Sequence, residues 1–151
     1  MTTISEDILN KTLELTPKEI DEIRRHPQRG AEILRPLEFV ELVSQIMLSH
    51  HERIDGKGYP MGLRGDQIPV GAKILSILDA YVSMISTKPF RRQLAIEESI
   101  EELVVNAGLQ FDTKAVSAFI EVLMDEGYID IEKYTSFSDR LRFGGKHKTI
   151  S

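Results

Sequence analysis

The segment from Pro69 to about Ile85 constrains the fold most strongly, because it is the most apolar helical pattern in the chain. Its apolar side chains cover well over half of a helix circumference, and they are Ile74, Leu75, Ile77, Leu78, Tyr81, Val82 and Ile85. A helix that is apolar over so much of its surface has to be covered by other elements. We therefore expect it to be the central core helix.

Four further segments place apolar side chains three and four residues apart, a spacing that is typical of amphipathic helices. The first begins at Pro17, because Thr16 and Glu19 can form a capping box around a proline in the first helical position. We expect His26-Pro27 to end or bend this helix, since the residue before a proline avoids the helical region. The others span residues 37 to 50, 94 to 107 and 113 to 126. These patterns predict a single all-α domain of roughly five to seven helices.

The length and composition fit one globular domain. The chain has 151 residues, of which 41% are hydrophobic and 28% are charged, and this balance allows a substantial core. We expect the domain to span residues 1 to 127, where the helical patterns lie. Residues 128 to 151 lose the periodicity and are predicted to form a C-terminal tail, in which His147 is interpreted as a solvated residue.

The overall charge and composition exclude some partners. A net charge of −5 and an isoelectric point near 5.4 argue against binding to nucleic acid, which needs an excess of basic side chains. No apolar run approaches the roughly 18 residues of a membrane-spanning helix, so no membrane association is expected. The chain has no cysteine, which excludes thiolate ligands and fits a reducing compartment. We therefore expect a cytoplasmic location.

Residues 49 to 69 concentrate the chemistry of the chain. Two adjacent histidines, His50 and His51, end the helical pattern of residues 37 to 50, and a glycine-rich loop with Tyr59 and several basic side chains follows. Histidine is the side chain that most often binds metals, and basic residues suit phosphate. Adjacent helical residues point about 100° apart, so the pair fits two metal ions better than one. Histidines at a helix end can equally complement the helix dipole, and the spacing alone leaves both interpretations open.

Other features also allow two interpretations. Asp79 lies within the apolar pattern of residues 69 to 85, and a buried carboxylate needs a cation beside it, either a basic side chain or a metal. His26 follows two arginines, a context that by itself favours a solvated residue. The basic turn at residues 87 to 92 is by itself typical of a solvated connector. The Tyr59 ring could simply pack under its loop.

The run HHERIDGKGYP, followed by GLRGDQIP, resembles the signature of HD-GYP domains, which are bacterial members of the HD phosphohydrolase superfamily. The resemblance extends upstream to LTPKEIDEIRRHPQRGAEIL and downstream to AKILSILDAY, TKPFR and AGLQFD, and it covers about residues 4 to 120. Members of this family degrade cyclic di-GMP with a cluster of two or three metal ions. The resemblance implies an HD-domain-like helical bundle and a similar substrate.

The resemblance also implies roles for individual residues. Four match metal ligands of the family, and they are His26, His50, His51 and Asp79. Three match residues that lie beside the nucleotide or hold its phosphates, and they are Tyr59, Lys88 and Arg91. The implied cofactor is Fe, Mn or another divalent transition metal, and the implied ligand is cyclic di-GMP.

The sequence departs from the family pattern in three places. The His-Asp pair that names the family, with an earlier acidic residue and histidine, would precede the stretch that matches residues 4 to 11, and the chain begins at Met1 without them. We therefore expect a bundle that lacks its N-terminal helices and does not hold the full metal cluster. Val82 replaces the second acidic residue of the usual Asp-x-x-Asp-Ala motif. Lys88 keeps the charge of the usual arginine without its bidentate geometry.

Two classes of function remain open on the sequence. The chain is either a metal-dependent cyclic di-GMP phosphodiesterase with impaired catalysis, or a non-catalytic module for signalling, nucleotide binding or protein interaction. In both cases the missing helices would leave the apolar surfaces of residues 37 to 50 and 69 to 85 open, and large apolar patches are rare on monomers. We expect a homodimer or a protein partner that covers them.

Overall fold

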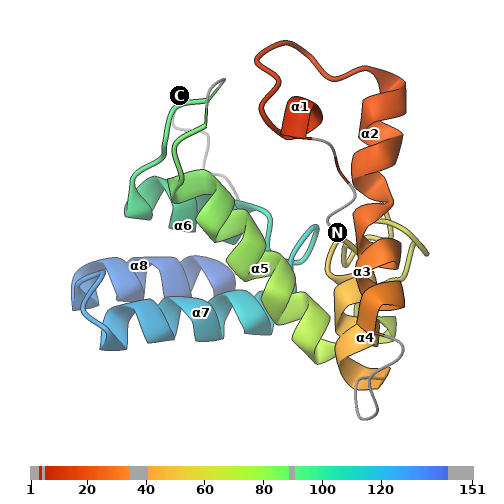
Figure 1. Cartoon of the computed structure of the whole chain (residues 1–151). Coiled ribbons are helices and arrows are strands. Elements are labelled where there is room, and N and C mark those ends of the chain that lie inside the picture. Colours follow the sequence, from red (N-terminus) through yellow and green to blue (C-terminus); the bar gives the residue numbers. More distant parts are fainter. Residues whose placement is uncertain (1–3, 5, 35–40, 89–90, 143–151) are drawn as a thin grey trace, which may run out of the picture.

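The computed structural model describes residues 4, 6–34, 41–88 and 91–142. Within these ranges every regular element is a helix (Figure 1), which confirms the all-α prediction. The elements are α1 (Glu6–Leu9), α2 (Pro17–Arg24), α3 (His26–Leu34), α4 (Glu41–Ser49), the 3-10 helix η1 (Gly65–Gln67), α5 (Val70–Ile85), α6 (Ile96–Val105), α7 (Thr113–Asp125) and α8 (Ile131–Arg142). Three predicted features lie outside the described residues: the start of the helix at 37 to 40, Pro89 with Phe90 in the basic turn, and the last part of the tail with His147.

Helix α5 lies between two groups of helices, with α2 to α4 on one side and α6 to α8 on the other (Figure 1). It contacts α4, α6 and α7 directly. The core lies on the α6 to α8 side and is made of buried apolar side chains: Ile77, Tyr81, Met84, Ile100, Leu103, Val104, Phe111, Val116, Ile120, Leu123, Ile129 and Phe137. The prediction that α5 is the central core helix is therefore confirmed. None of the described helices has both the length and the apolar character needed to cross a membrane.

A second face of α5 is more exposed than its apolar pattern predicted. Ile74, Leu78 and Val82 are exposed on this helix, and so are Leu42 and Val43 of α4. No described element fully covers these side chains, and periodicity alone could not reveal which faces of α5 find a neighbour. Their exposure agrees with the expected open apolar surfaces. The homodimer or protein partner stays a prediction.

The His26-Pro27 pair separates two helices, as the sequence predicted. Helix α2 ends at Arg24, and α3 begins at His26. Pro27 is buried, and α3 packs along α4. The rings of His26 and His51 are in contact, so the start of α3 lies beside the end of α4.

The predicted helices of residues 94 to 107 and 113 to 126 form as α6 and α7. Asp112 caps α7 by accepting hydrogen bonds from two first-turn amides. Its carboxylate also pairs with the buried Lys73 of α5 at 3.1 Å, which ties the start of α7 to α5. Gly108 and Gly127 follow the two helices with φ of 80° and 76°. These left-handed conformations favour glycine.

The segment that was predicted to lack helical periodicity contains α8, so the prediction is wrong for Ile131–Arg142. Phe137 and Ile129 are buried and belong to the core. Asp130 accepts a hydrogen bond from the backbone N–H of Lys133 at 2.8 Å, which caps the start of the helix. Helix α8 packs against α6 and α7. The core therefore extends beyond residue 127.

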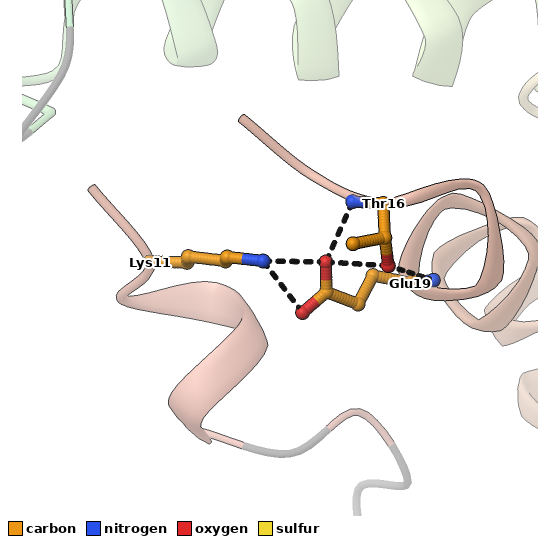
Figure 2. A network of polar contacts seen from close by, with 3 residues as sticks. All are labelled: Lys11, Thr16 and Glu19. Carbon is orange, nitrogen blue, oxygen red and sulfur yellow. Dashed lines mark hydrogen bonds and ion pairs between the residues drawn. The ribbon is translucent and has the colours of Figure 1, made fainter. Parts of the chain in front are cut away.

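Three residues hold the N-terminus of α2 (Figure 2). The backbone N–H of Thr16 donates to the Glu19 carboxylate at 2.6 Å, and the N–H of Glu19 donates to the Thr16 hydroxyl at 3.4 Å. This is the predicted capping box. Lys11 donates to both Glu19 oxygens at 2.8 and 2.7 Å, which ties the segment after α1 to α2. The hydrogen bonds from Lys11, and secondarily those from Thr16, lower the pKa of Glu19 from 4.5 to about 2.

This network predicts how stability depends on pH. A carboxyl group whose pKa falls on folding stabilises the folded state above its unfolded pKa and loses that contribution as the pH falls through its folded pKa. Glu19→Gln should therefore lower the thermal midpoint at pH 7, and the difference from the wild type should fade between pH 4.5 and about 2. Glu14→Gln, an exposed carboxyl in the preceding segment, is the control. A Glu19→Gln difference that is absent at pH 7, or persists undiminished at pH 2, contradicts the assignment.

Candidate metal centre

Three of the predicted ligands meet where α3 begins and α4 ends. His26 is the first residue of α3, and His50 and His51 directly follow α4. One nitrogen from each ring lies within 4.8 Å of the others. The closest pair is Nε2 of His26 and Nε2 of His51, which are 3.1 Å apart. The packing of α3 along α4 therefore brings residues that are distant in the sequence into one cluster.

The backbone orients two of the three rings. Nδ1 of His26 lies 2.6 Å from the carbonyl oxygen of Ile23, and Nδ1 of His50 lies 2.7 Å from that of Met47. A carbonyl oxygen only accepts hydrogen bonds, so Nδ1 carries the proton in both rings. The lone pair of each ring is then on Nε2, the usual arrangement of metal-binding histidines.

Burial keeps the His50 and His51 rings neutral. Removal from water lowers the pKa of His50, and it lowers the pKa of His51 from 6.5 to about 4, with further contributions from the neighbouring imidazoles. Both rings are therefore uncharged at neutral pH, which is the form that binds metal ions.

One pair in the cluster has the spacing of two ligands of a divalent transition metal. Nitrogen ligands lie about 2.1 Å from such an ion, so two adjacent ligands of one ion are separated by about 3.0 to 3.4 Å. The 3.1 Å between the nitrogens of His26 and His51 is within this range. Imidazole nitrogen suits Fe and related ions better than it suits Mg²⁺ or Ca²⁺. Of the described residues, no carboxylate belongs to the group.

Asp79 lies near the cluster but is not buried. The sequence predicted a buried carboxylate with a cation beside it, and the structure contradicts this, because Asp79 is exposed on α5. The reason is that its side chain belongs to the more exposed face of that helix. Its negative charge still reaches the histidines, since it raises the pKa of His50 and His51 against the larger effect of burial.

A pocket of about 280 Å³ adjoins the cluster. Its lining includes four predicted site residues, which are His50, His51, Tyr59 and Asp79. It also includes Arg24 and Lys57, which the sequence analysis did not assign to the site. The pocket therefore combines metal-binding, aromatic and basic groups.

Tyr59 packs directly against the cluster. Its ring stacks on His51 with centroids 5.0 Å apart and an interplanar angle of 26°. The guanidinium carbon of Arg24 lies 5.6 Å from the centroid of the Tyr59 ring, within the range of a cation–π contact. The backbone N–H of Tyr59 also donates to the carbonyl oxygen of His51 at 3.2 Å.

Lys88 and Arg91 are not brought to the pocket. Nζ of Lys88 donates to the hydroxyl of Ser83 at 2.6 Å, and a terminal nitrogen of Arg91 donates to the Ser83 carbonyl at 2.9 Å. These contacts hold both side chains at the C-terminal part of α5, and neither lines the pocket beside the histidines.

Glu52 organises the glycine-rich loop of residues 52 to 67, and sequence reasoning missed it. Its side chain is only 4% exposed. One carboxylate oxygen accepts from the backbone N–H groups of Met61 at 2.6 Å and Gly62 at 3.1 Å, and the other accepts from Leu63 at 2.9 Å. The sequence contained one signal for this role, which was an acidic residue at the start of a glycine-rich loop. The backbone N–H groups of such a loop have no helical acceptors and need other hydrogen-bond partners.

Two further features hold this loop. Arg53 forms a bidentate pair with Asp55 at 3.0 and 2.8 Å and also donates to Gln110 at 3.1 Å, which anchors the loop to the segment between α6 and α7. A Cβ atom on Gly58 would lie 2.4 to 2.6 Å from backbone atoms of Glu52 and Arg53. Only glycine allows so close an approach.

Comparison with known proteins identifies relatives of the chain. The family model described as HD domain matches residues 2–115. The chain is 34% identical over 119 residues, 78% of its length, to RpfG, a cyclic di-GMP phosphodiesterase response regulator of Xanthomonas campestris. It is 37% identical over 121 residues, 80% of its length, to a cyclic di-GMP phosphodiesterase of Pseudomonas aeruginosa. These matches cover 32% and 29% of the two relatives, so the chain spans about a third of their length.

One solved structure shares the fold. A cyclic GMP-AMP specific phosphodiesterase of Vibrio cholerae superimposes on the chain with a TM-score of 0.60. The match covers 93% of this chain and 36% of the phosphodiesterase chain. The two sequences are 24% identical over this match, and the likeness concerns the fold alone.

Proposed function

Because the chain belongs to the HD domain family, we propose that His26, His50 and His51 form the metal site of a phosphohydrolase scaffold. The observation that carries this proposal is the convergence of three imidazole nitrogens within 4.8 Å. Two of the rings are held by backbone carbonyls with Nε2 free to bind. The ion is Fe, Mn or another divalent transition metal.

Asp79 completes the proposed ligand set from the pocket wall. Its charge influences both His50 and His51, and it lines the same pocket. A divalent ion at this position would supply Lewis-acid polarisation of a phosphate oxygen. The histidines would bind and orient the ion, and Tyr59 stacks on one face of the His51 ring.

The proposed ligand is a cyclic dinucleotide, by analogy with the relatives that are named cyclic di-GMP phosphodiesterases. Tyr59, Arg24 and Lys57 line the pocket and offer one aromatic and two basic side chains. Lys88 and Arg91 are proposed as further phosphate contacts. In that role they would have to exchange their hydrogen bonds with Ser83 for bonds to the ligand, which weakens their contribution.

Catalysis by this chain alone is proposed to be impaired. The proposed ligand set offers three imidazoles and one carboxylate, that of Asp79, which lies outside the histidine cluster. Two divalent ions a few ångströms apart repel each other strongly unless negative ligands compensate their charge. Such a ligand set supports one ion better than a cluster. The scaffold would then act mainly by binding metal and ligand.

Metal binding is the first test. Equilibrium dialysis of the chain against Mn²⁺, or anaerobically against Fe²⁺, should give about one ion per chain. His51→Ala should weaken binding at least about 10-fold, since even the loss of groups that merely orient ligands costs 10- to 100-fold. Glu132→Gln on the exposed side of α8 is the control and should bind like the wild type. Binding that is absent, or unchanged in His51→Ala, contradicts the proposed site.

Hydrolysis and ligand binding are the second test. With Mn²⁺ or Fe²⁺ present, the chain should show little hydrolysis of cyclic di-GMP, and titration calorimetry should give weak binding that depends on the metal. Turnover near the usual enzymatic range of about 1 to 10³ per second, abolished by His50→Ala, would refute impaired catalysis. Submicromolar binding without metal that is lost in Arg91→Ala would instead identify a receptor.

We further propose that protein covers the exposed apolar side chains of α4 and α5, as a homodimer or with another partner. These side chains are Leu42 and Val43 of α4 and Ile74, Leu78 and Val82 of α5, and large apolar patches are rare on monomers. Analytical ultracentrifugation at micromolar concentration should show a dimer. If the chain is instead a monomer that needs another partner, an apolar fluorescent dye should bind strongly to the exposed side chains. A clean monomer without dye binding argues against a partner.

A further inference from the structure

The third histidine of the cluster is held differently from the other two. His26 and His50 each donate from Nδ1 to a backbone carbonyl three residues earlier. The side-chain contacts that the structure gives His51 are to other rings, with Nε2 facing His26 at 3.1 Å and its face stacked on Tyr59. The direction of Nε2 of His51 therefore depends on where the glycine-rich loop places Tyr59.

The position of Tyr59 depends on Glu52. The buried carboxylate accepts three hydrogen bonds from consecutive backbone N–H groups just after Tyr59, at Met61, Gly62 and Leu63. Hydrogen bonds from amides to an ionised carboxylate are short and strong. Glu52 directly follows His51 in the chain. The residue that holds the loop is therefore covalently joined to the histidine on which Tyr59 of that loop stacks.

The close approach at Gly58 fixes the other side of Tyr59. The backbone of Gly58 lies so near to Glu52 and Arg53 that a Cβ has no space there. The Tyr59 N–H donates to the His51 carbonyl at 3.2 Å. Arg24 lies over the Tyr59 ring, which also stacks on His51. Tyr59 is thus constrained from both sequence directions.

From this geometry we infer that Glu52 is a positioning residue for the metal centre. Its carboxylate fixes residues 61 to 63, these residues hold Tyr59 against His51, and the stacked ring aims Nε2 of His51 at His26. The inference rests on the proposed metal site for its role in function. The chain of contacts itself does not depend on a metal.

Glu52→Gln in the full chain tests the first link. Glutamine has nearly the same shape but offers one acceptor oxygen, and its NH₂ group would face a backbone donor, so the three N–H groups cannot all be satisfied. We expect Mn²⁺ affinity in equilibrium dialysis to fall by about 10-fold or more, the range for losing groups that orient metal ligands. Glu121→Gln, an exposed carboxylate on α7, is the matched control and should bind like the wild type.

Tyrosine variants test the second link. Tyr59→Phe keeps the ring and should retain wild-type Mn²⁺ affinity, whereas Tyr59→Leu should weaken it about as much as Glu52→Gln does. Because both residues act through His51, the effects should be less than additive in the double variant. Wild-type affinity in Glu52→Gln or in Tyr59→Leu, or full additivity, overturns the inference.

A metal-free measurement separates this inference from the proposed function. In the NMR spectrum of the apo chain, the His51 ring protons should carry a ring-current shift from Tyr59. Glu52→Gln should reduce that shift while the signals of His26 and His50 move little, and circular dichroism should confirm that the variant is folded. If the wild type binds no Mn²⁺ but these shifts change as expected, the metal site fails and the positioning stands. Unchanged His51 shifts in both Glu52→Gln and Tyr59→Leu refute the positioning.

Discussion

The structure depends on the burial of one side of α5. This side packs against α6 and α7 and forms the centre of the core. Helix α4, which belongs to the group of α2 to α4, also contacts α5. Each fully buried aliphatic or aromatic side chain contributes about 1.5 to 3 kcal/mol relative to exposure, so a core of this kind outweighs any surface interaction described above. Through α4, the same helix sets the position of the histidines. Through Asp79, it contributes one wall of the adjoining pocket.

Local sequence signals predicted most of the helices. The capping box of Thr16 and Glu19 predicted the start of α2, and the His26-Pro27 pair predicted its end, because both signals act through contacts within a few residues. The sequence pattern did not predict helix α8, because its inward side chains, such as Tyr134 and Phe137, form a narrow stripe among charged and hydroxyl residues. Its burial comes from contact with α6 and α7, which a local pattern does not contain.

The candidate site shows the same difference between features that residue type predicts and features that depend on the folded chain. Residue type and resemblance selected His26, His50 and His51, and the structure brings them together, although their role as ligands stays a prediction. The exposure of Asp79 could not be predicted, since it depends on what covers one face of α5. The positions of Lys88 and Arg91 follow from hydrogen bonds to Ser83, and Glu52 acts on amides that follow it in the loop. Such contacts arise only after the chain has folded back on itself.

The proposed function requires that three imidazoles of one chain share a divalent ion. X-ray absorption at the manganese edge of the Mn²⁺-loaded chain measures the ligands directly. We predict nitrogen neighbours near the usual distance of about 2.1 Å. The outer-shell scattering of the imidazole rings should be present in the wild type and lost in the double variant His26→Ala/His51→Ala. A spectrum with oxygen neighbours only, unchanged in that variant, would contradict the proposed function.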